Sequence, residues 1–199
     1  MATKESILTA ALDLASEKGL GNVSLSQIAK KAGIQKASLY SHFSSKDEII
    51  TSLYEFLRKK AVEKVDPGGV DYGKLVKGRS MREILNMTVA SYRTMNEDPD
   101  MVCFYRFITS ECLFSKEAAG IMTAETDRMI LTTKQLFYAM QVQGIVRFTD
   151  IDAAAVSFAM TVHALMDREH IRESAGLEAD DMIETYIGEF SRIYGGEEA

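Results

Sequence analysis

The chain has few of the residues that a disulfide scaffold, a sheet-rich fold or a membrane protein would need. It contains two cysteines, two prolines and no tryptophan in 199 residues. No segment approaches the ~20 consecutive apolar residues of a membrane-spanning helix, and the polar start, MATKESILTAAL, is unlike a secretory signal. Alternating strand patterns are lacking, whereas Ala, Leu, Met, Ile, Lys and Glu dominate. We therefore expect an all-α, cytoplasmic protein with no membrane partner.

The two cysteines are spaced as separate thiols. Cys103 and Cys112 fall on one predicted helix, on opposite faces and roughly 13 Å apart, which is too far for a disulfide. Free thiols suit a reducing compartment. We interpret both as buried structural residues, with a redox role as the alternative.

Catalytic and metal-binding patterns are also lacking. The last two of the three histidines, His163 and His170, share a predicted helix with Asp167 and Glu169, but the spacing is not that of metal ligands. The sequence has no G-x-S-x-G and no phosphate-binding glycine loop. We expect no enzyme activity, no metal and no cofactor.

The segment from Val23 to Glu48, VSLSQIAKKAGIQKASLYSHFSSKDE, predicts two short helices joined by a tight turn and followed by a third helix. Ser24 and Gln27 form a capping box that starts the first helix. Gly33 gives the backbone freedom that the turn needs. A short helix with a polar outer face, held by a helix packed across it, is the design of a DNA-reading helix-turn-helix.

The second helix of this segment has one apolar and one polar face. Leu39 and Phe43 lie four residues apart and anchor it to the core. The face that it turns outward is formed by Lys36, Ala37, Tyr40 and Ser41.

Charge is divided unevenly along the chain. The formal net charge is −6, yet no acidic residue lies between Glu17 and Asp47, a stretch that contains five lysines. Up to Val65 there are 10 basic and 7 acidic side chains, and after it 13 and 22. A phosphate backbone attracts the first part and repels the second. We therefore expect DNA binding at one end only.

Residues 7–50, ILTAALDLASEKGLGNVSLSQIAKKAGIQKASLYSHFSSKDEII, resemble the DNA-binding domain of the TetR family of bacterial transcription regulators. An Ala/Leu-rich first helix ending at Gly19, the S-x-x-Q helix, the AG turn, LYxHF and SKxE follow one another in the family's order. Ala15 departs from the pattern, because the family often has an aromatic residue there. The resemblance implies that Tyr40, His42 and Lys46 hold the DNA backbone.

We expect the same surface to read bases. Lys36 favours guanine O6 and N7, and Ala37 suits a thymine methyl group. The full set of predicted DNA-binding residues is Ser24, Ser26, Gln27, Gln35, Lys36, Ala37, Ser38, Tyr40, Ser41, His42 and Lys46.

The pattern of apolar residues and turn residues predicts about nine helices in two domains. Residues 1–46 would form the helix-turn-helix domain and residues 47–199 a helical ligand-binding and dimerisation domain, with the fourth helix, 46–64, as connector. The glycine-rich segment DPGGVDYGKLVKG, residues 66–78, is a plausible flexible connection. Further helices are expected at 80–96, 99–114, 116–143, 150–174 and 179–194.

Met and aromatic side chains are concentrated in the middle helices, where they can line an adaptable apolar pocket. Core packing is the alternative for each of them, and a solvated or interface position for the polar residues among them. The predicted ligand-binding residues are Met87, Tyr92, Phe104, Tyr105, Ile108, Met122, Glu125, Met129, Phe137 and His163.

The last two predicted helices are too apolar for helices that bury one narrow stripe. The resemblance implies that these helices form a homodimer, and the alternative is that they only close the chain's own core. The predicted interface comprises Ala155, Phe158, Ala159, Val162, Met166, Ile183, Tyr186, Ile187 and Phe190.

Together these patterns predict a homodimeric TetR-type regulator, usually a repressor, that binds a near-palindromic DNA operator and is released by a small, largely apolar effector. An activator with the same contacts is one alternative. A helical carrier or enzyme for a lipid-like molecule, with a vestigial helix-turn-helix, is another, and the acid-free lysine run argues against it.

Overall fold

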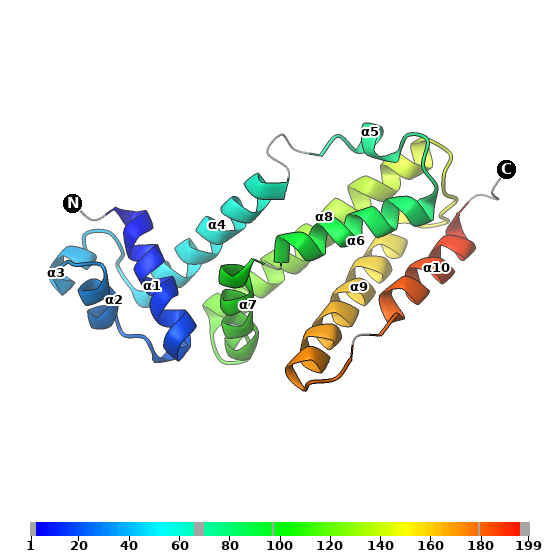
Figure 1. Cartoon of the computed structure of the whole chain (residues 1–199). Coiled ribbons are helices and arrows are strands. Elements are labelled where there is room, and N and C mark those ends of the chain that lie inside the picture. The colour runs from blue at the N-terminus through cyan, green and yellow to red at the C-terminus, as the bar shows by residue number, and fades with distance from the viewer. Residues whose placement is uncertain (1–2, 66–69, 97, 179, 196–199) are drawn as a thin grey trace. The chain divides into compact units, whose positions relative to one another are not determined.

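The computed structural model describes residues 3–65, 70–96, 98–178 and 180–195, and these residues fold almost entirely into helices (Figure 1). The one pairing of extended backbone in these ranges is an isolated bridge between Val146 and Gly195. The all-α prediction is therefore confirmed. The elements in chain order are α1 (Lys4–Lys18), η1, a 3-10 helix (Leu20–Asn22), α2 (Leu25–Lys31), α3 (Lys36–Leu39), α4 (Lys46–Val65), α5 (Tyr72–Val76), α6 (Met81–Asn96), α7 (Pro99–Glu111), α8 (Lys116–Val142), α9 (Ile151–Ser174) and α10 (Met182–Tyr194).

The short helix α5 corrects part of the prediction of a flexible connection, because it lies within that segment. Its first turn is capped by Asp71, whose carboxylate accepts a hydrogen bond from Lys74 N at 3.1 Å. At its other end Val76 is fully buried. The cap and the buried valine stabilise this helix more than the flanking glycines destabilise it. Residues 66–69 of the predicted connection lie outside the described residues.

The first compact unit comprises residues 1–68 and 93–124. Its core joins α1 to α4, since Ile7, Ile28, Leu39 and Leu53 are all fully buried in it. The buried side chains of α7, Met101, Phe104 and Ile108, belong to the same core. The helix-turn-helix segment is thus held by α1, α4 and α7. The functional domain boundary predicted near residue 46 stays a prediction.

The second compact unit comprises residues 69–92 and 125–199. Phe137 of α8 lies at its centre with no exposed surface. Its ring centroid lies 4.8 Å from that of Phe148, 5.6 Å from Phe158 and 5.9 Å from Phe190. Aromatic packing of this kind holds α8, α9 and α10 together. None of the helices in the described ranges is long and apolar enough to cross a membrane.

Candidate DNA-binding site

Local hydrogen bonds fix the start of α2 and the turn that follows it. Ser24 N donates to Gln27 Oε1 at 2.8 Å, and Gln27 N donates to Ser24 Oγ at 3.3 Å. This confirms the predicted capping box. Gly33 has a φ of +70°, a conformation that favours glycine, and it turns the chain so that Ile34 N reaches Ala29 O at 2.9 Å. The angle between α2 and α3 is set by this turn.

The reading helix α3 is shorter than its sequence pattern predicts. It ends at Leu39, because the next residues tighten into a turn in which His42 N donates to Leu39 O at 2.9 Å. Leu39 and Phe43 are nonetheless buried as predicted. The side chains predicted to face outward do so, and the exposed residues of this segment are Lys36, Ala37, Ser38, Tyr40 and Ser41.

Two lysines lie over aromatic rings of this segment, one exposed and one buried. Lys36 Nζ is 6.0 Å from the centroid of the Tyr40 ring, which is 49% exposed. Lys4 Nζ lies 5.2 Å from the ring centroid of Phe43. A cation at this distance from a ring face is weakly attracted to it, so Lys36 is held close to the face that Tyr40 presents.

The start of α4 lies against the backbone of η1. Lys46 Nζ donates a hydrogen bond to Gly21 O at 2.9 Å. Side-chain hydrogen bonds also cap this helix start. Ser45 Oγ accepts from Glu48 N, and the Glu48 carboxylate accepts from Ser44 N and Ser44 Oγ, both at 2.7 Å. The two bonds from Ser44 lower the pKa of Glu48.

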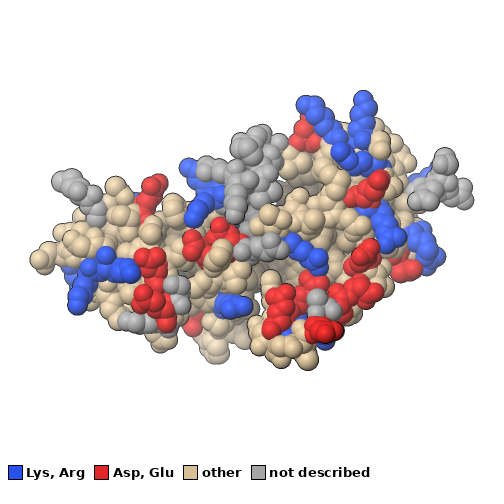
Figure 2. Space-filling view, viewed as in Figure 1, with Lys and Arg blue, Asp and Glu red and all other residues tan. Residues whose placement is uncertain are grey.

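All predicted DNA-binding residues lie in the first unit, around α2, α3 and the start of α4. Ser24, Ser26 and Gln35 are exposed, while Gln27, His42 and Lys46 are partly covered. Figure 2 shows basic side chains over α2, and acidic side chains gathered over α9 and α10. Gly21 was not among the predicted residues. It accepts the hydrogen bond from Lys46 through its backbone carbonyl, a group that every residue has, so no side-chain pattern could have indicated it.

The predicted ligand-binding residues are divided between the two units. Phe104, Tyr105, Ile108 and Met122 belong to the first, and the other six, Met87, Tyr92, Glu125, Met129, Phe137 and His163, to the second. Phe104, Ile108 and Phe137 each lie in a hydrophobic core, so for these three residues the structure shows core packing, which was the stated alternative. Contact of the ten residues with a ligand stays a prediction.

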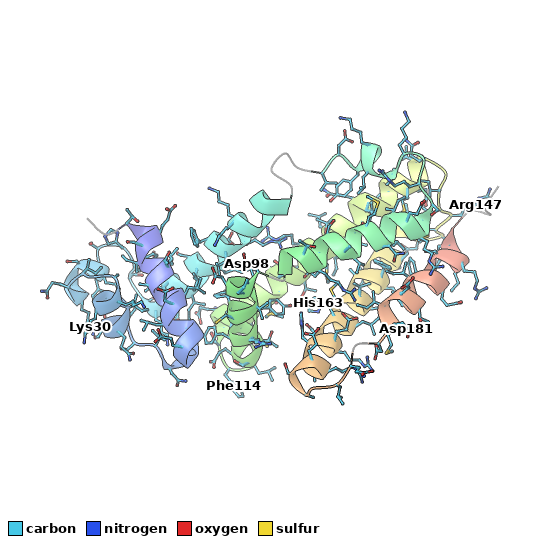
Figure 3. The ribbon with its side chains drawn as sticks, viewed as in Figure 1. Lys30, Asp98, Phe114, Arg147, His163 and Asp181 are labelled. Atoms are coloured by element: carbon cyan, nitrogen blue, oxygen red, sulfur yellow. The ribbon has the colours of Figure 1, made fainter. Side chains whose placement is uncertain are left out.

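Two of the predicted polar ligand residues, Glu125 of α8 and His163 of α9, are near enough for the charge of Glu125 to act on His163. Glu125 is a charged side chain with only 6% of its surface exposed, and its Oε2 lies 3.7 Å from Arg128 Nε. His163, labelled on α9 in Figure 3, has its Nδ1 3.1 Å from Asp167 Oδ2. The hydrogen bond with Asp167 raises the pKa of His163 against the effect of burial, and the charges of Asp167 and Glu125 add to the increase. In the described ranges no group of three such side chains is placed to hold a metal ion.

The raised pKa of His163 predicts how stability depends on pH. The folded protein binds this proton more tightly than the unfolded chain, so the stabilisation is complete below the unfolded pKa of about 6.5 and is lost as pH rises through the folded pKa. We expect His163→Gln to flatten the decrease in melting temperature between about pH 6 and about pH 8. His170→Gln, at an exposed histidine of the same helix, is the control. Equal pH slopes for wild type and His163→Gln would contradict the prediction.

Most of the predicted dimer-interface residues are buried within the single chain, as the alternative expects, and their part in a dimer stays a prediction. Eight of the nine are buried within the single chain, and Tyr186 is partly buried. Apart from Ala159, they belong to the second core or pack against it, because α9 and α10 pack with α6 and α8. The outward face of α9 instead presents Val156, Met160 and Ile171, which are 40%, 46% and 70% exposed.

The fold and the exposed α3 surface define a helix-turn-helix protein. Residues 7–53 match the family model described as bacterial regulatory proteins, tetR family. The match covers α1 to the first part of α4.

Curated relatives match mainly this first part. An uncharacterised HTH-type transcriptional regulator of Bacillus subtilis (strain 168), YvdT, is 41% identical over 61 residues, 31% of each chain. The icaADBC negative transcriptional regulator IcaR of Staphylococcus aureus (strain Newman) is 50% identical over 46 residues, 23% of this chain and 25% of its own. The chain thus matches about a third or less of the length of these two relatives.

Solved structures match over nearly the whole chain and support the fold. A TetR-family regulator from Mesorhizobium loti MAFF303099 superposes with a TM-score of 0.74 at 17% identity, covering 97% of this chain and 96% of its own. A regulator from Saccharomonospora viridis in complex with choline has a TM-score of 0.67 at 22% identity, with 95% of both chains covered. The SmeT–triclosan complex has a TM-score of 0.71 at 17% identity, covering 99% of this chain and 93% of its own.

Proposed function

We propose that this protein is a DNA-binding transcriptional repressor that a small, largely apolar effector releases from its operator. The observation that carries the proposal is the exposed face of α3, with Lys36, Ala37 and Tyr40 outward while Leu39 is buried behind them. This face lies in the acid-free lysine run, where a phosphate backbone is attracted. The negative regulator among the relatives supports the repressor role.

On DNA, α3 enters the major groove and the surrounding side chains hold the backbone. Lys36 donates to guanine O6 and N7, and Ala37 contacts a thymine methyl group. Tyr40, His42 and Lys46 bind phosphates. The remaining predicted residues, at the start of α2 and along α3, complete the surface.

A second copy of the chain gives the operator its symmetry. The partner packs on the outward face of α9, where Val156, Met160 and Ile171 leave apolar surface exposed. The buried residues of α9 and α10 support this face from within the chain. Two α3 helices held about 34–36 Å apart then read a near-palindromic site.

The effector acts by binding more tightly to a conformation that does not fit the operator. Two of the similar structures support a small-molecule effector, since they are complexes with choline and with triclosan. In this chain the buried Glu125 and the partly buried His163 are the polar groups proposed to orient such a molecule.

The proposal is tested by selecting bound sequences from a library of random duplex DNA. We expect the wild-type protein to enrich an inverted repeat. Lys36→Ala should weaken binding to that repeat by about 1–3 kcal/mol and relax the preference at one base pair of each half-site. Lys30→Ala, which removes the same charge from an exposed position on α2, should leave the selected sequence unchanged. A selection without any enriched sequence would refute specific DNA reading.

A further inference from the structure

The 3-10 turn η1 touches two helices that are far from it in sequence. Gly21 lies in this turn, three residues before the N-cap of α2. Its carbonyl oxygen accepts the hydrogen bond from Lys46 Nζ at the start of α4. A Cβ atom added to Gly21 would lie 3.7 Å from the Phe107 ring and 3.7 Å from the Glu111 carboxylate. The backbone of the turn therefore packs against α7.

The bond to Gly21 restricts a side chain that is otherwise flexible. Lysine has four rotatable methylene carbons, and ordering it against a phosphate costs conformational entropy. An ammonium group has three donors, so Gly21 O uses one of them and leaves donors for a phosphate. A Lys46 held in this way loses less freedom when DNA binds.

The position of Gly21 depends in turn on α7. Met101, Phe104 and Ile108 of α7 are buried in the first core, and Phe107 packs against it. These contacts fix the position of α7 within the first unit. Gly21 and Asn22 of the turn are exposed, and the side chains that a Cβ atom on Gly21 would meet are those of Phe107 and Glu111. Contact with these two side chains limits how far the Gly21 carbonyl can shift toward α7.

We propose that Phe107 and Glu111 are positioning residues for DNA binding: through η1 they place the Gly21 carbonyl that orients Lys46 toward a phosphate. The proposal rests on the proposed function, in which Lys46 contacts the DNA backbone. It makes DNA affinity sensitive to the position of α7, although these residues of α7 act only through Gly21 and Lys46.

A double-mutant cycle with the full-length protein tests the proposal. Binding of random-sequence duplex DNA is measured between roughly 50 and 200 mM KCl for wild type, Phe107→Leu, Lys46→Ala and the double variant. Lys46→Ala should lower the slope of log K against log [salt] by about 0.9 for each phosphate that is no longer neutralised, which is about a 3.5-fold difference in affinity over this range. Phe107→Leu should cause part of this decrease in the wild-type background and none in the Lys46→Ala background.

Met101→Val is the matched control, because it shortens another α7 side chain of the same core. Its effect should be equal in both backgrounds, and melting curves should show both α7 variants folded. If Phe107→Leu does not fold, Glu111→Ala, which changes the second contact with the turn, replaces it in the cycle.

The outcomes separate the two proposals. If the positioning variant changes DNA affinity by the same factor in both backgrounds, the inference about α7 is overturned, while the proposed DNA-binding function still stands. Wild-type protein that shows no salt-dependent DNA binding would overturn the proposed function itself.

Discussion

Replacing Phe137 with alanine is expected to lower the free energy of unfolding of the second unit by about 3–5 kcal/mol. The Phe137 ring has no exposed surface and contacts the rings of Phe148, Phe158 and Phe190. Truncation removes the buried apolar area and leaves a cavity among three rings that cannot all move inward, because each is attached to a different packed segment.

Denaturant unfolding followed by far-UV circular dichroism measures this decrease, since the chain has no tryptophan to report by fluorescence. Tyr138→Ala is the matched control at the next position. Its ring is 50% exposed and its hydroxyl donates to Asp152 Oδ1 at 3.3 Å, so we expect a decrease below about 1 kcal/mol. Similar decreases for both variants would show that the second core is not centred on Phe137.

Met160→Glu is expected to dissociate the proposed dimer and abolish operator binding with it. The glutamate would place an unpaired charge in the apolar contact between two α9 helices, where its desolvation is uncompensated. Folding of the single chain should be unaffected, because Met160 is 46% exposed within it. Light scattering at micromolar concentration measures the change from dimer to monomer.

Thr132→Glu adds the same charge on α8 and is the control. The Thr132 hydroxyl donates to Arg128 O and Met129 O of its own helix, so its removal breaks no contact between helices. Persistence of the dimer in Met160→Glu, or a monomeric wild type, would contradict the proposed α9 interface.

The helix-turn-helix was predictable because its determinants are local. The Ser24–Gln27 box, the glycine turn at Gly33 and the four-residue spacing of Leu39 and Phe43 lie within one short segment and appear in the structure. The α5 helix was missed because burial of Val76 depends on the fold of the second unit, which no local pattern records.

The candidate interface shows a different limit. Phe158 and Met160 are both apolar residues of α9, yet the first is buried within the chain and the second is exposed. Composition predicts an apolar helix but does not say which face packs within the chain and which is left for another copy. The electrostatic effect of Glu125 on His163, which lie on two helices, likewise depends on how α8 and α9 pack.

In α3 the residue that packs in the core is different from the residues that face outward, and this affects how the protein can evolve. Leu39 holds the helix in the core, whereas Lys36, Ala37 and Ser38 project outward. Substitutions at the outward positions cost the fold little, because exposed side chains away from caps and networks contribute little to stability. A duplicated gene can therefore acquire a new target sequence through a few surface substitutions while it keeps the inherited scaffold.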